Sequence, residues 1–355
     1  MAKIDALFKL LKQQGASDLH ISTGAPPIFR LHGEMEKLHY PPLTDEQSRA
    51  LIYEILTPEQ RQLFEERCDL DFAYPLADVA RFRGNILETH RGIAAVFRII
   101  PSKILSADDL KLPEGVRKLT RLKKGLVLVT GPTGSGKSTT LAAMIDLINC
   151  TRKEHILTLE DPLEFVHENK MSLLNQRQIG THSHSFANAL RAALREDPDV
   201  ILVGEMRDLE TISMALTAAE TGHLVFGTLH TNSAAKTIDR IIDAFPKDAQ
   251  EQVRTMLGES LKGVICQQLL KTADGKGRAA ALEILIGNSA ISNLIREGKT
   301  FQIPSIMQTA KGEGMQLMDQ HILDLLKAKK ITGEEALRCA LDKRSFEALL
   351  PKNAP

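Results

Sequence analysis

Eight consecutive residues near the middle of the chain, 131–138, read G-P-T-G-S-G-K-S and match the pattern G-x-x-x-x-G-K-[ST] at every fixed position. In such a loop, glycines let successive backbone N–H groups turn toward the phosphates of a nucleotide. A lysine then bridges the β- and γ-phosphates, and a hydroxyl binds Mg²⁺. An apolar run precedes the motif and a helical pattern follows it, as this kind of site requires. We therefore expect ATP and Mg²⁺ here, bound by Thr133, Gly134, Ser135, Gly136, Lys137, Ser138 (also a metal ligand) and Thr139.

A second candidate is the acidic residue Glu205, which follows the short apolar run 200–203 and Gly204. Residues just past the carboxyl end of a strand face the ligand in open parallel sheets. A carboxylate there would hold the water shell of a magnesium ion or polarise the attacking water. Glu205 is therefore predicted to be both metal-associated and catalytic, although the aspartate usual in such sites is replaced by Gly204-Glu205.

Three carboxylates, Glu160, Asp161 and Glu164, lie at the end of another apolar run, 155–159. A carboxylate within hydrogen-bond reach of a water in line with the γ-phosphate can act as a general base. An acidic surface turn fixed by a proline is the alternative, but the position after the phosphate-binding helix favours the catalytic interpretation. Glu164 is the candidate, and the spacing leaves open whether it or Glu205 is the base.

Two histidines, His223 and His230, flank the apolar run 224–228. A lone histidine is more often a satisfied structural residue than a catalytic one. A polar side chain at the far end of a strand beside the nucleotide can, however, sense its γ-phosphate. We assign that role to His230 rather than to His223.

These candidate residues need a parallel sheet to position them. Val-, Ile- and Leu-rich runs alternate with helical patterns, which is typical of strands covered on both faces and predicts an α/β fold. The runs lie at 126–130, 155–159, 200–203 and 224–228, and helices replace strands after Gly287. A stripe of Met315, Met318, Ile322, Leu325 and Leu326 and a cap formed by Thr332 with Glu335 mark two of these helices.

The first third of the chain has a different pattern, that of a small α+β domain. Ile4, Leu7, Phe8 and Leu11 share one face of a predicted helix. Alternating runs predict strands at 18–22, 27–32, 68–74, 79–90 and 93–100, and a capping pattern opens a single helix from Thr44 to about Arg67. We expect a domain at 1–100, a linker at 101–118, an ATPase core at 119–288 and a C-terminal helical subdomain at 289–355.

Composition narrows the range of partners. Lys+Arg and Asp+Glu are both 45, Trp is absent and Tyr occurs three times. Proteins that wrap nucleic acid or lie on anionic lipid usually carry a basic excess, so any such partner would have to be met by a local patch, and nucleic acid is not expected. The basic residues within 117–124 are read as a solvated helix face rather than as a nucleic-acid patch. The four dispersed cysteines and the lack of an apolar stretch near the ~20 residues of a membrane span favour a cytoplasmic protein that is not inserted in a membrane.

Taken together, the motifs resemble those of the secretion and pilus motor ATPases over essentially the whole chain. The resemblance rests on the phosphate loop, residues 160–164, Gly204-Glu205 with the following Met-Arg-Asp, and the histidine segment 221–231. Two further segments, 192–199 and 215–223, are specific to this group. The chain lacks the four-cysteine zinc module and the longer N-terminal region usual in assembly-type motors, and is therefore similar to the type IV pilus retraction branch.

The resemblance implies a homohexameric ring with a PAS-like N-terminal domain and a RecA-like P-loop core. Nucleotide would lie between these two domains and the next subunit, and arginines of the N-terminal domain would reach the triphosphate. Arg81, Arg83 and Arg98 match the family's segments, with cross-strand pairing on the surface as the alternative. Hydrolysis would rotate N-terminal domains against neighbouring cores and move an inner-membrane pilus platform protein, which powers pilus retraction and twitching motility from the cytoplasmic side.

One motif departs from that branch. The retraction signature Ala-Ile-Arg-Ala/Asn-Leu reads A-I-S-N-L at 290–294, so Ser292 removes a cation. This leaves open whether the protein is the main retraction motor or an accessory paralogue. Three other functions also remain open: a pilus assembly or type II secretion ATPase, a hexameric DNA translocase, and a nucleotide-binding regulator that does not hydrolyse ATP.

Overall fold

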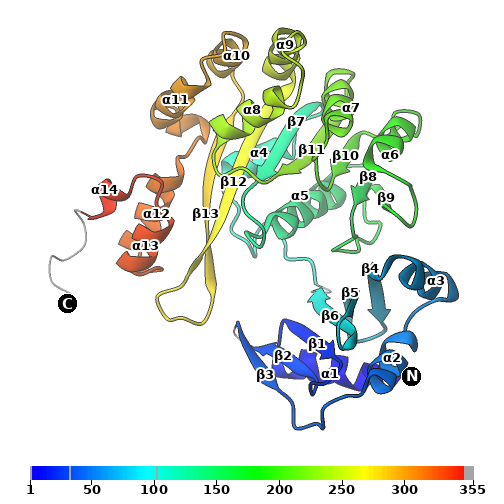
Figure 1. The fold of residues 1–355 in the computed structure, drawn as a ribbon. Coiled ribbons are helices and arrows are strands. Elements are labelled where there is room, and N and C mark those ends of the chain that lie inside the picture. Colours follow the sequence, from blue (N-terminus) through cyan, green and yellow to red (C-terminus); the bar gives the residue numbers. More distant parts are fainter. Residues whose placement is uncertain (1, 32, 101–102, 348–355) are drawn as a thin grey trace. The chain divides into compact units, whose positions relative to one another are not determined.

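The structure is a computed structural model that describes residues 2–31, 33–100 and 103–347 of the chain. The chain divides into two compact units. The first comprises Met1–Lys103 and Pro162–Val166, and the second comprises Ile104–Asp161 and His167–Pro355 (Figure 1). Most of the segment predicted to be a linker, from Ile104 onward, thus packs with the second unit.

The first unit contains a six-stranded antiparallel sheet in the order β3-β2-β1-β6-β5-β4 (Figure 1). Aromatic side chains form the centre of its core: the rings of Phe8 and Phe82 stack with centroids 4.2 Å apart, and Phe97 meets Phe8 edge-on at 5.0 Å. The elements are α1 (Ile4–Gln14), β1 (Asp18–Ser22), β2 (Ile28–Leu31), β3 (Glu34–Lys37), α2 (Asp45–Tyr53), α3 (Pro58–Arg67), β4 (Asp69–Leu76), β5 (Ala80–Thr89) and β6 (Gly92–Ile100).

One prediction for this unit was wrong, and one strand was missed. The single helix expected from Thr44 to about Arg67 is two helices, because Thr57 begins a second capping box and Pro58 occupies the first turn of α3. A proline disfavours the helical conformation in the residue before it, so the chain cannot run through this point as one helix. Strand β3 was not predicted, since all four of its residues are exposed and it has no apolar face.

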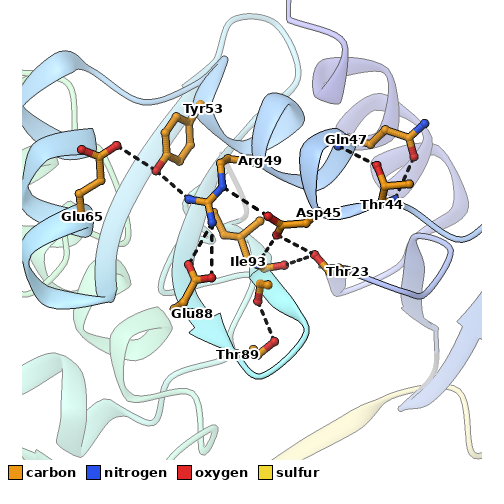
Figure 2. Close-up of polar contacts among 11 residues, drawn as sticks. Thr23, Thr44, Asp45, Gln47, Arg49, Tyr53, Glu65, Glu88, Thr89 and Ile93 are labelled. Carbon is orange, nitrogen blue, oxygen red and sulfur yellow. Dashed lines mark hydrogen bonds and ion pairs between the residues drawn. The ribbon is translucent and has the colours of Figure 1, made fainter.

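A polar cluster joins α2 to the β5–β6 hairpin (Figure 2). Asp45 Oδ1 accepts hydrogen bonds from the Ile93 N–H at 2.9 Å and from the Thr23 hydroxyl at 3.3 Å. Arg49 reaches from the next turn of α2 to Glu88 on β5, at 3.3 Å. The hydrogen bond from Ile93, with the other partners, holds the pKa of Asp45 below its usual range. The carboxylate therefore stays ionised and fixes the start of α2 on the hairpin.

The second unit contains a seven-stranded sheet in the order β13-β12-β7-β11-β10-β8-β9. Its neighbouring strands are parallel except for β12 and β13. The strands are β7 (Gly125–Thr130), β8 (His155–Glu160), β9 (Leu173–Gln178), β10 (Val200–Val203), β11 (Leu224–Leu229), β12 (Leu261–Lys271) and β13 (Arg278–Ile286). The four predicted strands are confirmed, whereas β9, β12 and β13 were missed.

Both faces of this sheet are covered, as the apolar runs predicted (Figure 1). On β7, Leu126 and Leu128 belong to one buried apolar cluster, and Val127 and Val129 belong to another. The helices are α4 (Glu114–Leu119), α5 (Lys137–Thr151), α6 (Phe186–Ala193), α7 (Leu209–Glu220), α8 (Ala234–Asp243) and α9 (Gln250–Ser260).

After β13 the chain is helical, as predicted. The stripe residues Met315, Met318, Ile322 and Leu325 are buried, and Thr332 caps a helix by accepting a hydrogen bond from the Glu335 N–H. The elements are α10 (Ser289–Arg296), α11 (Ile303–Thr309), α12 (Met318–Lys327), α13 (Gly333–Cys339) and α14 (Lys343–Glu347), with short 3-10 turns at Thr300–Gln302 and Lys311–Glu313. None of the helices in the described part of the chain has the length and apolarity to span a membrane.

Ser292, the position that departs from the retraction signature, lies on α10 against α9. Its hydroxyl donates a hydrogen bond to the carbonyl oxygen of Gly258. A Cβ added to Gly258 would lie 3.2 Å from the carbonyl oxygen of Ser292, so the two helix backbones are almost in contact.

We expect Gly92→Ala to destabilise the first unit by about 1–3 kcal/mol. Gly92 has φ +119°, and a Cβ there would overlap the Asp45 carboxylate and push it away from the Ile93 N–H. The measurement is urea unfolding of the full chain followed by tyrosine fluorescence. Trp is absent and all three tyrosines lie within the first unit, so this signal reports on that unit alone.

Gly15→Ala is the matched control, because Gly15 also has a positive φ, +68°, but has no neighbouring atom within 4 Å of an added Cβ. It carries the backbone strain without the overlap. A loss at Gly92 no larger than the loss at Gly15 would contradict the proposed role of Asp45.

Candidate nucleotide site

The predicted phosphate loop connects the end of β7 to the start of α5. Gly131 and Gly136 both have positive φ, +142° and +85°. An added Cβ at Gly131 would overlap the main-chain oxygen of Gln267, and one at Gly136 would lie 2.8 Å from the side-chain nitrogen of Gln267. These two positions therefore require glycine for two reasons, backbone conformation and the close approach of β12.

Lys137 is the first residue of α5, and its ammonium group folds over the loop. Its Nζ donates hydrogen bonds to the carbonyl oxygens of Gly131 at 2.8 Å and Pro132 at 3.2 Å. Thr133 and Gly134 are exposed at the tip of the loop. The residues that follow, 135–140, are partly or fully buried. The free N–H groups and the dipole of a helix start make such a position favourable for an anion.

Glu205 and His230, predicted separately, lie together in the second unit. Strands β10 and β11 are parallel neighbours, so the residues after them meet at one edge of the sheet. His230 Nε2 lies 2.9 Å from Glu205 Oε1, and Arg207 Nε lies 2.5 Å from the same oxygen. His223 instead bonds the carbonyl oxygen of Ala218, 2.9 Å from its Nδ1, at the start of the strand.

The Glu205 carboxylate is charged. Burial acts to raise its pKa, but the hydrogen bond and charge of Arg207, with His230 beside it, hold the pKa below its ordinary value. The same Arg207 is attracted by Asp161 from the acidic segment. Glu160, at the end of β8, accepts a hydrogen bond from the Thr158 hydroxyl at 2.7 Å. The carboxyl ends of these strands thus present the ionised Glu205 carboxylate, which is held in place by Arg207.

Four other predicted site residues belong to the first unit. Glu164 lies in Pro162–Val166, which packs with that unit. Arg83 and Arg98 are direct partners across β5 and β6, and Arg81 precedes Arg83 by two positions on the same strand. Arg98 pairs at 2.8 Å with the buried carboxylate of Asp18, its direct partner on β1, which is the cross-strand pairing given above as the alternative.

Sequence reasoning missed a cavity of about 760 Å³ beside the phosphate loop. It begins at Gly136 and Thr139, at the start of α5, and extends to the C-terminal helix α12. Its other lining residues include Leu269, Ala280, Leu282, His321 and Leu325. Sequence reasoning also missed Gln267, whose side chain is hydrogen-bonded to the loop. No pattern around this residue could have identified it, because its partners lie more than 120 positions away.

The comparisons with known proteins agree with this geometry. Residues 2–308 match the family described as "Type II/IV secretion system protein". The chain is 56% identical over 320 residues to the "Twitching motility protein" of Neisseria gonorrhoeae, covering 90% of this chain and 86% of that protein. It is 55% identical to the "Type IV pilus retractation ATPase PilT" of Pseudomonas aeruginosa, covering 94% and 96%.

Among solved structures, the pilus retraction motor PilT with bound ADP matches with a TM-score of 0.90 at 49% identity, over 98% of this chain and 99% of that one. This likeness confirms the predicted fold class, a RecA-like P-loop core with an N-terminal α+β domain and a C-terminal helical part. The chain therefore belongs to the type II/IV secretion system protein family and is an ATPase of that family.

Proposed function

We propose that this protein is a hexameric motor ATPase that powers type IV pilus retraction and twitching motility. The observation that carries the proposal is that two features occur in the same sheet of the second unit. One is a phosphate loop that requires glycine where β12 approaches it, and the other is the Glu205–His230 pair at the carboxyl ends of β10 and β11. Near full-length similarity to the retraction proteins supports retraction over pilus assembly or type II secretion.

Nucleotide is proposed to bind with its phosphates on the loop and its base and ribose toward the cavity beside α5. Residues Thr133 to Thr139 would supply backbone N–H groups and hydroxyls to the phosphates. Lys137 would exchange its two carbonyl partners for phosphate oxygens, which is favourable because a charge-assisted hydrogen bond to an anion is stronger than one to a neutral carbonyl.

Mg²⁺ fits the residues that are present. The described residues contain no group of three or more His, Cys, Asp or Glu side chains that could hold a metal by themselves. Mg²⁺ at phosphate sites usually keeps several waters and takes one or two protein ligands plus phosphate oxygens. Ser138 would supply one ligand, and Glu205 would hold a water of the ion's shell. When bound, the ion neutralises charge that develops on the phosphates.

For the chemical step, we assign Glu205 or Glu164 to orienting and deprotonating the attacking water. The ionised state of Glu205 supports its part in this role. His230 would sense the γ-phosphate through its contact with Glu205. Loss of the γ-phosphate would remove the contacts that hold the closed state, a common switching device in nucleotide-driven proteins.

The arginines are assigned to the charge of the transition state. Guanidinium groups on γ-phosphate oxygens stabilise that charge and make hydrolysis depend on domain closure. Arg83 and Arg98 are included because they match the family's segments. Their carboxylate partners are Asp71 at 4.0 Å and Asp18 at 2.8 Å, and each arginine would exchange its partner for phosphate oxygens. Arg81 completes the set, in the hexamer proposed above.

The remaining proposals concern partners and place. Force would be applied to an inner-membrane pilus platform protein, from a cytoplasmic position peripheral to that membrane. The balanced charge of the chain and its few aromatic residues disfavour nucleic acid as a partner.

We expect Glu205→Gln to lower kcat for ATP hydrolysis about 100-fold or more while the Kd for ADP changes less than threefold. The substitution removes the charge that acts on the water but keeps the shape of the site, and general base catalysis contributes about 10²–10⁴-fold. Steady-state turnover and ADP titration would measure the two effects. Glu220→Gln, on an exposed glutamate at the end of α7, is the control. Lost ADP affinity with unchanged kcat would contradict the role assigned to Glu205.

At the cellular level, a strain without this protein should keep surface pili but lose twitching motility. Restoring the wild-type chain should restore movement, and Lys137→Ala, which removes the phosphate-bridging cation, should not. Loss of surface pili would instead indicate an assembly motor. Strong stimulation of the ATPase by single-stranded DNA, with a steep salt dependence, would indicate a translocase.

A further inference from the structure

Gln267, on β12, contacts both the phosphate loop and the first turn of α5. Its Nε2 donates a hydrogen bond to the carbonyl oxygen of Ser135 at 2.7 Å. Its Oε1 accepts a hydrogen bond from the hydroxyl of Thr140 at 2.7 Å. Its main-chain oxygen occupies the space that a side chain at Gly131 would need. A single buried residue therefore contacts the start of the loop at Gly131, its middle at Ser135 and the first turn of α5 at Thr140.

The sheet sets this arrangement. Strand β12 runs parallel to β7, and Cys266 is paired with Thr130, the last residue before the loop. The next residue, Gln267, consequently stands where the chain of β7 turns away into the loop. Its side chain is only 3% exposed. A buried amide whose oxygen and nitrogen are both paired gives one orientation to the groups that it bonds.

We propose that Gln267 is a positioning residue that holds the phosphate loop in the shape that accepts nucleotide. Ser135 and Thr140 flank the positions Lys137, Ser138 and Thr139, which are assigned to the phosphates and the metal. The carboxamide fixes both flanks, so it sets the direction of the N–H groups between them. This inference rests on the proposed binding of ATP at the loop.

The alternative is an amide that only satisfies buried polar groups. Both roles predict a less stable variant, because removal of the amide leaves a buried carbonyl and a buried hydroxyl without partners. Only the positioning role also predicts weaker binding of nucleotide. Since the loop holds phosphates in the ground state and in the transition state alike, KM should rise while kcat changes little.

The experiment compares Gln267→Leu with Gln268→Leu in the full-length protein. The two glutamines are consecutive on the same strand and undergo the same chemical change, and Gln268 is placed opposite Ala281 of β13 in the sheet. For Gln267→Leu we expect the KM for ATP and the Kd for ADP to rise about tenfold, with kcat changed less than about threefold. The rise in Tm caused by saturating ADP should also shrink, because that rise depends on the ratio of ADP concentration to Kd. Gln268→Leu should match the wild type in all four quantities.

A milder variant, Thr140→Val, removes one of the two hydrogen bonds and carries the test if Gln267→Leu does not fold. It should raise the same KM and Kd about threefold, and the double variant should show less than the product of the two effects, since both act on one contact. Unchanged KM, Kd and ADP-dependent Tm shift in either single variant, with only a lower Tm without nucleotide, would overturn the inference. If the wild type and Gln268→Leu bound no ADP, the proposed function itself would be refuted.

Discussion

The close approach of two backbones, β12 and the start of the phosphate loop, is the constraint on which the second unit depends. Because the carbonyl oxygen of Gln267 fills the space beside Gly131, the loop can turn only where no side chain is present. The turn directs the chain into α5 and places Lys137 at the start of the helix. Strand pairing therefore fixes β7, which precedes the loop. The loop itself is fixed by a neighbour that is distant in the sequence.

Polar groups that need partners in an apolar environment lie at the end of β7, on β12, after β11 and on α8. The Thr130 hydroxyl donates to the Cys266 sulfur at 3.1 Å, and the hydroxyls of Thr231 and Thr237 lie 2.7 Å apart. Burial raises the pKa of the Cys266 thiol to about 12, so it stays protonated. Burying these polar groups costs little free energy because each has a partner. Their hydrogen bonds also join the end of β7 to β12 and the segment after β11 to α8.

Features of the fold that depend on local sequence could be predicted, and features that depend on distant contacts could not. The parallel strands were predictable because Val-, Ile- and Leu-rich runs such as 126–130 are typical of strands that are buried on both faces. The loop was predictable from its sequence pattern. The positions of Glu205 and His230 were predictable because each residue comes just after a strand, which is a local feature. The break at Pro58 was also local, since Thr57 to Gln60 repeats the capping pattern of the preceding helix. The prediction of a single helix did not include this second cap.

Other features could not be predicted, for physical reasons. Strand β3 has no buried side chain and hence no pattern. Gln267 looks like any polar residue in a strand. Its role comes from the pairing of β12 with β7 and from its contacts with Ser135 of the loop and Thr140 of α5. The cavity beside α5 exists only because β12, β13 and α12 assemble around it.

The near contact of α9 and α10 at Gly258 and Ser292 has a mechanical consequence. Where side chains separate two helices, rotamer changes can absorb part of a small displacement. Here the backbones themselves meet, and closely packed protein has low compressibility. A shift of one helix is therefore transmitted directly to the other. In a protein that works against a load, α9 and α10 should move together as one rigid body.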